Sequence, residues 1–225
     1  MIGIIIILFL SWLLLWLIEK KQLTVLGLAL TKKRLKDFII GLVIASLVCA
    51  IYHIINVYPA NNFWIYSQEI STYMLFNSIW WIIKSVLFEE FIFRGALLFI
   101  AINRFSAKWA CILSAIAFGV YHWFSYGSFG NPIQMIIVLL MTGSFGWVLA
   151  YAFMKTRSIY LPIAIHLGWN LANILVFSNG PLGPQLMIKA NDNHLEGLTS
   201  LFTFLFQIFA LPLLIYLYVK RFAKG

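Results

Sequence analysis

Long apolar runs recur along this chain, and they restrict its fold more than any other feature. Residues 2–18 and 38–56, for example, contain no Asp, Glu, Lys or Arg. A helix of about 20 apolar residues can cross the hydrocarbon core of a bilayer, where only helices or closed barrels satisfy every backbone polar group. The runs show no strand-like alternation of polar and apolar residues, which argues against a barrel. The sequence therefore predicts an all-α, polytopic bundle of transmembrane helices.

Composition agrees with that class, because the chain is 63% hydrophobic and only 10% charged. Soluble domains are about half apolar and about a quarter charged. Seven spans are expected in a single domain, 1–225, at residues 2–18, 38–56, 73–101, 109–122, 133–154, 159–177 and 198–219. The third segment is long enough to kink or break, and Gly95 is the expected weak point.

The 16 basic residues indicate how the helices are oriented. If seven spans alternate, one side holds Lys189 alone, Lys84 and Arg94 lie within a segment, and all other basic residues share the opposite side. Those others are Lys20, Lys21, Lys32, Lys33, Arg34, Lys36, Arg104, Lys108, Lys155, Arg157, Lys220, Arg221 and Lys224. Lys and Arg favour the cytoplasmic side, so the amino terminus should lie outside and the carboxyl terminus in the cytoplasm.

The same pattern explains the formal net charge of +9. Basic residues beside the ends of apolar runs contact anionic lipid. The sequence has no basic patch interleaved with aromatic residues, so nucleic-acid binding is not expected. We therefore expect a multi-pass protein of the cytoplasmic membrane, with the lipid bilayer as its partner. Residues 19–37 should form a cytoplasmic connection.

Three ionisable residues lie inside the third apolar segment, namely Glu89, Glu90 and Arg94. Charged groups at membrane depth are costly and usually functional. Glu90 and Arg94 are four residues apart and can pair on one helical face, whereas Glu89 is rotated by about 100° and points elsewhere. Glu90 is thus expected to be held by Arg94, with Glu89 free to face a cavity. The alternative is a buried structural triad that stabilises helix packing.

Two further segments carry polar residues at a spacing of four, Phe118 with His122 and His166 with Asn170. At about 1.5 Å per residue from the nearest cytoplasmic basic residue, Glu89, His122 and Asn170 lie roughly 22, 21 and 20 Å deep, and His166 near 14 Å. Three helices therefore bring polar groups to one layer of the membrane, as an intramembrane active site requires. Each histidine alone could simply bond a neighbouring helix. His53, which has no acidic neighbour in the sequence, is expected to make such a structural hydrogen bond.

A carboxylate, two histidines and an amide suit activation of water and stabilisation of an oxyanion. The chain has no Gly-x-Ser-x-Gly elbow and no His-Glu-x-x-His motif, which disfavours a serine nucleophile and a zincin-type helix. Cys49 and Cys111 have neither metal-site nor disulfide spacing and are expected to be core residues.

At these residues the chain resembles the CAAX protease and bacteriocin-processing (CPBP, or Abi) family of intramembrane endopeptidases. Its three motifs match Glu89-Glu90-x-x-x-Arg94, Phe118-x-x-x-His122 and His166-x-x-x-Asn170 in order and separation, within roughly residues 73–177. The resemblance implies hydrolysis of a peptide bond in a membrane-associated peptide or protein.

The resemblance also implies a role for each motif residue. Glu89 would act as general base on a water polarised together with His122, and His166 and Asn170 would hold the tetrahedral oxyanion. Glu90 and Arg94 would organise the site as an ion pair, and Phe118 would pack one turn before His122.

The family has been described both as metalloproteases and as metal-free glutamate proteases, so the cofactor is a separate question. Zinc could be held by Glu89, His122 and His166. A zinc-bound Glu89 would no longer be available as the base, leaving Glu90 to serve while paired to Arg94. We therefore expect a metal-free mechanism without a cofactor.

Two other function classes remain open on the sequence alone. One is a non-catalytic membrane interaction or bacteriocin-immunity protein of the same fold, against which the intact Glu89, His122 and His166 argue. The other is an ion or proton transporter, since buried Glu and His also form relays, although the paired interrupted helices of many carriers are missing.

Eukaryotic members of the family cleave prenylated carboxyl termini. This Ile- and Lys-rich chain resembles bacterial proteins, which favours a bacteriocin leader, a signal-peptide remnant or another membrane peptide as substrate.

Overall fold

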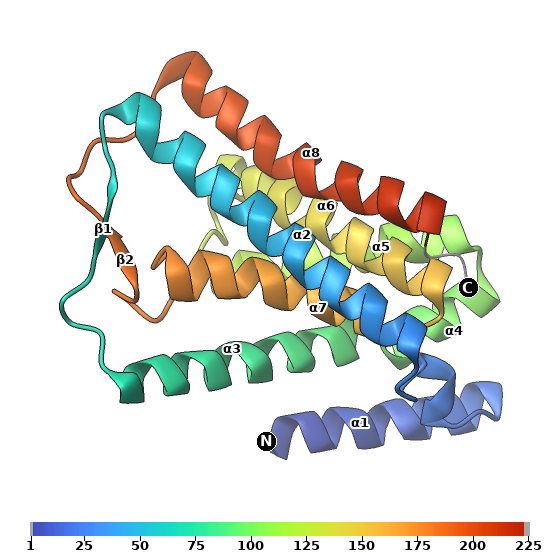
Figure 1. Ribbon diagram of the computed structural model, residues 1–225. Coiled ribbons are helices and arrows are strands. Elements are labelled where there is room, and N and C mark those ends of the chain that lie inside the picture. Colours follow the sequence, from blue (N-terminus) through green and yellow to red (C-terminus); the bar gives the residue numbers. More distant parts are fainter. Residues whose placement is uncertain (1, 223–225) are drawn as a thin grey trace.

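The computed structural model describes residues 2–222 and consists of helices joined by short connections (Figure 1). The α-helices are α1 (Ile2–Leu14), α2 (Lys32–Val57), α3 (Thr72–Phe93), α4 (Ala96–Arg104), α5 (Ala107–Ser125), α6 (Pro132–Thr156), α7 (Tyr160–Asn170) and α8 (Gly197–Phe222). Wider π-helical turns extend α1 through Leu15–Glu19 and α7 through Leu171–Val176, and 3₁₀ turns cover Leu23–Leu26 and Tyr58–Ala60. The predicted all-α bundle is confirmed.

The helices follow the predicted segments, with one displaced boundary. Helix α2 begins at Lys32, where Thr31 accepts a hydrogen bond at its side-chain oxygen from the backbone N–H of Arg34 at 3.2 Å. A threonine at this position caps a free helical N–H. The connection predicted over 19–37 therefore ends at Thr31, and the basic residues 32–36 belong to the first turns of α2.

The predicted break at Gly95 is confirmed, since α3 ends at Phe93 and α4 begins at Ala96. Gly95 has φ −84° and ψ −133°, which no helical residue adopts. A Cβ atom there would collide with the carbonyl oxygen of Phe91. The glycine thus permits the chain to turn immediately after Arg94.

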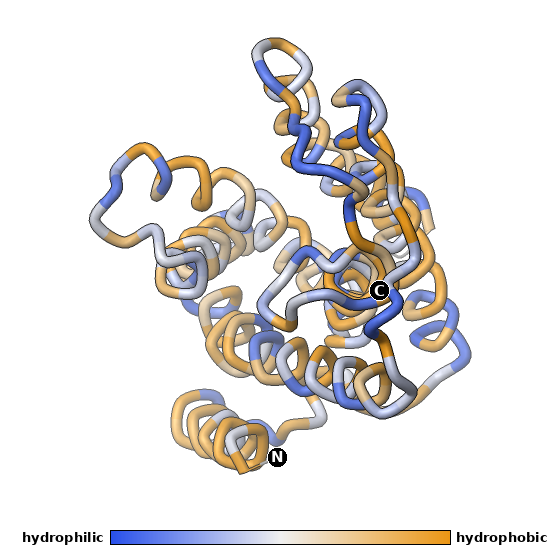
Figure 2. Tube along the Cα trace, turned by 90° about the vertical axis from the view of Figure 1, so that its left-hand side faces the viewer, coloured by the Kyte–Doolittle hydropathy of each residue, from blue (hydrophilic) through white to orange (hydrophobic). Residues whose placement is uncertain are grey.

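Within residues 2–222, four helices are long and apolar enough to cross a membrane, namely Ile2–Glu19, Lys32–Ala60, Pro132–Thr156 and Gly197–Phe222, and Tyr160–Val176 is a shorter apolar helix. The count of seven spans stays a prediction. Large apolar side chains such as Phe9, Leu47 and Phe209 are exposed on the outside of the bundle, as a lipid-facing surface requires. Apolar residues run along the helices in Figure 2, with hydrophilic ones frequent in the connections.

A small antiparallel sheet, which the sequence did not predict, joins two distant connections. Strand β1 (Trp64–Tyr66) pairs with β2 (Met187–Lys189) in the register Ile65 to Ile188. The buried Asn62 donates from its side-chain amide to the carbonyl oxygens of Asn191 and Asn193 at 2.8 and 3.0 Å. These contacts tie the loop before β1 to the loop after β2, at the left in Figure 1.

Helix ends and connections at the other end of the bundle are also tied together. Arg104 donates to Glu19 at 3.0 Å, Ser158 donates to the carbonyl oxygen of Gly27 at 3.3 Å, and Tyr218 donates to Asp37 at 2.6 Å. The basic residues that flank these contacts therefore gather at one end of the molecule, which we call the basic end. The opposite end, which carries β1 and β2, is called the sheet end.

Candidate active site

An ion pair between α3 and the turn that follows it lies in the core of the site. Arg94 donates from Nη1 to Oε1 of Glu90 at 3.0 Å and from Nη2 to the carbonyl oxygen of Gly146 at 3.2 Å, and neither charged side chain is exposed. The guanidinium lies over the ring of Phe118 at 4.2 Å, a geometry in which a cation is attracted to an aromatic face. Glu90 and Arg94 thus connect α3, α5 and α6.

His166 joins α7 to this ion pair. Its Nδ1 lies 2.7 Å from Oε1 of Glu90, so a proton on Nδ1 would be donated to that carboxylate. The other ring nitrogen, Nε2, then faces Oε2 of Glu89 at 3.9 Å. His166 therefore stands between the two glutamates, and its ring orientation is determined by Glu90.

His122 approaches Glu89 from α5 in a similar orientation. Its Nδ1 lies 2.8 Å from the carbonyl oxygen of Phe118, and because a carbonyl can only accept, Nδ1 carries the proton. Nε2 is directed at Oε2 of Glu89, also at 3.9 Å. The rings of Phe118 and His122 are 4.4 Å apart, as expected for residues one helical turn apart.

Glu89 differs from Glu90 in what its two oxygens contact. Oε1 accepts a hydrogen bond from Ser85 at 3.2 Å. Oε2 is buried and has no hydrogen-bond partner within residues 2–222. The 3.9 Å separations from both imidazoles exceed a direct hydrogen bond, and polar groups at such a distance commonly share a bridging water. This oxygen is therefore suited to hold and deprotonate a water molecule.

These groups line a cavity of about 450 Å³ within the bundle. Glu89, His122, His166 and Asn170 all border it, so the structure brings together the residues that the sequence singled out from three helices. Trp81, Ser85 and Glu89 also border a smaller side cavity of about 300 Å³ next to Gly3 of α1. The Glu89 carboxylate is thus reached from two directions.

The cavity contains polar residues that the sequence analysis missed. Tyr126 follows α5, Gln207 comes from α8, and Ser85 bonds Glu89 directly. Ser85 lies four residues before Glu89, and Gln207 is an amide inside an apolar helix. Both features were visible in the sequence as signals of a polar interior.

Other residues singled out in the sequence make packing contacts or hydrogen bonds within the fold. His53 is buried and its Nε2 lies 2.8 Å from the side-chain oxygen of Asn173, which confirms the expected structural hydrogen bond. Cys49 and Cys111 are buried, free thiols, as predicted. Lys84, the basic residue that lies within the third segment together with Arg94, has its ammonium group over the ring of Trp80, at 5.7 Å from the ring centroid.

A zinc ion at the site would need three protein donor atoms that converge on one point. Within residues 2–222, no group of three His, Cys, Asp or Glu side chains is arranged to hold a metal ion. In the set Glu89, His122 and His166, both imidazoles approach the same carboxylate oxygen through Nε2 at 3.9 Å. Each ring is oriented by a hydrogen bond at Nδ1, as is also usual for histidines that bind metals. The metal-free mechanism therefore stays a prediction.

Comparison with known proteins addresses the same part of the chain. Residues 71–172 match the family model described as type II CAAX prenyl endopeptidase Rce1-like. No curated protein and no solved structure was found to match the chain. The matched segment contains every candidate site residue from Glu89 to Asn170 and nearly coincides with the motif-bearing core expected at 73–177. Over this segment, which is just under half of the chain, the chain is similar to the Rce1-like family of CAAX endopeptidases, a family of peptidases.

Proposed function

We propose that this protein is an intramembrane endopeptidase that hydrolyses a peptide bond of a membrane-associated peptide or protein with a water molecule activated by Glu89 and His122. One observation carries the proposal above all. The buried Oε2 of Glu89, which has no hydrogen bond within the described residues, faces Nε2 of both His122 and His166 at 3.9 Å inside a cavity.

In the proposed reaction, Glu89 takes a proton from water while Nε2 of His122 accepts a hydrogen bond from the same water. The water oxygen forms a bond to the carbonyl carbon of the substrate, giving a tetrahedral oxyanion. The carbon–nitrogen bond then breaks, and Glu89 returns the proton to the leaving amine. A positioned carboxylate can serve first as base and then as acid because its proton is held within reach of both groups.

The oxyanion requires hydrogen-bond donors, and His166 and Asn170 are proposed to supply them. Nδ1 of His166 is directed at Glu90, so a donor at Nε2 means that the ring carries both protons in that step. Glu90 and Arg94 are positioning residues here, because they orient His166 without touching the substrate.

No step of the proposal uses a metal ion or another cofactor. The substrate is proposed to be a membrane-associated peptide such as a bacteriocin leader or a signal-peptide remnant.

The test is cleavage of a peptide library by the purified protein in detergent. Glu89→Gln and His122→Ala should each slow cleavage by about 10²–10⁴-fold, the typical contribution of general acid–base catalysis. Glu196→Gln, at an exposed loop position, is the control and should keep the wild-type rate. Wild-type cleavage should also persist after exhaustive chelation.

Three results would contradict the proposal at different points. Equal cleavage by wild type, Glu89→Gln and His122→Ala would remove the catalytic assignment. If the protein contained stoichiometric zinc and lost its activity when the zinc was removed, the metal-free mechanism would be wrong. Proton flux or uptake that depends on Glu89, without any cleavage, would favour a transporter.

A further inference from the structure

The two ends of the bundle differ strongly in charge. The basic end carries all basic residues from Lys20 to Lys36, together with Arg104, Lys108, Lys155, Arg157, Lys220 and Arg221. Within the described residues, the connections of the sheet end carry the acidic Glu69, Asp192 and Glu196 but only one basic residue, Lys189. Clusters of Lys and Arg beside membrane helices remain on the cytoplasmic side. The sheet end should therefore face away from the cytoplasm.

The catalytic cavity opens toward the sheet end. Its lining includes Tyr52 in the last turns of α2, Tyr126 just after α5, and Asn179 and Pro181 in the loop that follows α7. All of these positions lie where the helices approach the connections of the sheet end. Glu89, by contrast, lies close to the end of α3 that leads to the basic end, at the bottom of this space.

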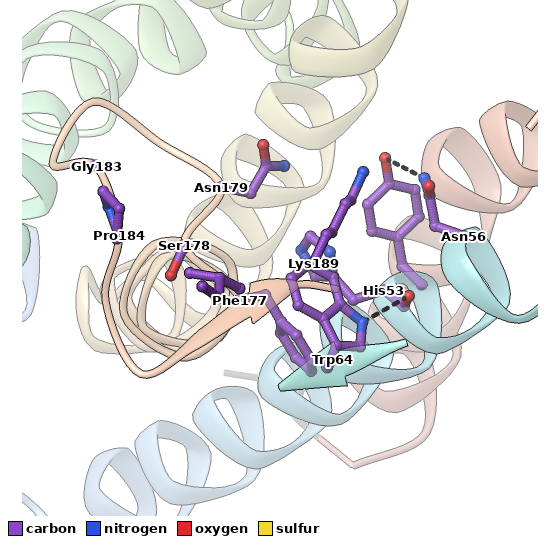
Figure 3. Close-up of a pocket in the computed structure, with 11 residues that line it drawn as sticks. His53, Asn56, Trp64, Phe177, Ser178, Asn179, Gly183, Pro184 and Lys189 are labelled. Carbon is purple, nitrogen blue, oxygen red and sulfur yellow. Dashed lines mark hydrogen bonds between the residues drawn. The ribbon is translucent and has the colours of Figure 1, made fainter. Parts of the chain in front are cut away.

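A second cavity, the outer pocket, continues from the first. It has a volume of about 470 Å³, and Tyr52 and Asn179 line both cavities. Figure 3 shows its wall, built from the aromatic side chains of His53, Trp64 and Phe177, with Lys189 of β2 extending into the same space as Asn56 and Asn179. The ring of His53 stacks on Phe177 at 4.5 Å, so the wall is held by packing within the protein. Polar groups and aromatic faces together suit a hydrated peptide segment.

From these observations we infer that the substrate reaches Glu89 from the extracytoplasmic face, through the outer pocket. The inference rests on the proposed function and specifies its substrate class. The substrate is a peptide segment presented outside the cytoplasm, such as an exported peptide or the outer flank of a membrane helix. A carboxyl terminus displayed in the cytoplasm would approach the basic end, away from the pocket. The side cavity next to Gly3 lies between α1 and α3 along the bundle, and it favours neither face.

The orientation is tested first, without reference to activity. Lys189→Cys in the outer pocket and Lys108→Cys at the basic end are both at exposed positions. The native Cys49 and Cys111 are buried, so wild type gives the background. A membrane-impermeant maleimide added to spheroplasts should label Lys189→Cys, whereas Lys108→Cys should be labelled only after permeabilisation. The opposite pattern would overturn the inference.

Entry is tested with a water-soluble peptide that the purified protein cleaves in detergent, coupled to an impermeant carrier. Right-side-out vesicles should cleave it, and inverted vesicles should do so only after permeabilisation. Modification of Lys189→Cys with a bulky maleimide should reduce cleavage relative to the same unlabelled variant, whereas modification of Lys108→Cys in permeabilised vesicles should not. Cleavage confined to intact inverted vesicles would overturn outer entry and leave the peptidase intact. Absence of cleavage in detergent as well would reject the proposed function itself, and the labelling result would still stand.

Discussion

Glu89 and Glu90 are neighbours in the chain but occupy opposite environments. Consecutive helical residues are rotated by about 100°, so Glu90 points at Arg94 and His166 while Glu89 points into the cavity. One oxygen of Glu90 contacts both Arg94 and His166, and this carboxylate is completely buried. The two glutamates are therefore proposed to have separable roles, Glu90 in orienting the site and Glu89 in reacting.

This separation leads to a prediction about stability. Glu90→Gln leaves the buried guanidinium of Arg94 without its counter-ion, and breaking a buried pair by removing one partner costs about 3–5 kcal/mol. Glu89→Gln, which is isosteric and removes no ion pair with Arg94, should change the free energy of unfolding much less. Denaturation of both variants in detergent measures the difference. Equal stability of Glu90→Gln and wild type would show that the pair does not hold the fold.

At the residue scale, the sequence predicted which side chains are important but not which atoms meet. The spacing of four correctly paired Glu90 with Arg94 and placed Phe118 beneath His122. It did not predict that His166 would bond Glu90 through Nδ1, because that contact depends on the rotation of α7 about its own axis. For the same reason Gln207 of α8 was missed as a cavity residue.

Helix α7 owes its position to a close approach to α2 at Gly168. A Cβ atom at this residue would collide with the carbonyl oxygen of Leu42, and the Gly168 carbonyl accepts a hydrogen bond from Ser46 at 3.0 Å. Gly168 lies between His166 and Asn170 on the same helix, so the distance between α2 and α7 determines where both side chains stand.

We therefore predict that Gly168→Ala pushes α7 away from α2 and reduces cleavage together with stability. Overpacking of a core typically costs about 1–3 kcal/mol. Gly143→Ala in α6 is the matched control, since its Cβ atom would have only ordinary contacts of 3.6 Å or more. Thermal unfolding and cleavage rates of both variants provide the measurement. A fully active Gly168→Ala would show that the site tolerates displacement of α7.

At the element scale, hydropathy identified the helices well because apolar length is a local property. The break at Gly95 was also predicted. The two π-helical turns and the three-residue strands were not, since neither has a periodicity long enough to recognise. The early start of α2 was missed because its first turns are basic rather than apolar.

Across the whole molecule, the two ends differ in what they contribute to the cavity and to stability. The cavity opens at the sheet end, while α2 and α8 are held together at the basic end by the hydrogen bond from Tyr218 to the buried Asp37. Tyr218→Phe should lower the free energy of unfolding by about 1.5–3 kcal/mol, the typical contribution of a hydrogen bond to a charged group. The cleavage rate per folded molecule should stay at the wild-type value, because this contact lies far from the opening. A selective loss of activity without loss of stability would link the two ends functionally.

Local properties of the chain were sufficient to establish an all-α membrane protein with its basic residues on one side, and to indicate which polar residues share a layer of the bilayer. Apolar length, helical periodicity and the position of Lys and Arg act within one segment at a time. Folding decided how these segments combine. The two 3.9 Å approaches to one oxygen of Glu89, the pairing of residues 64–66 with 187–189, and the opening at the sheet end all depend on contacts between helices remote in the chain. Such contacts are set by close packing at positions like Gly168, which no single segment encodes.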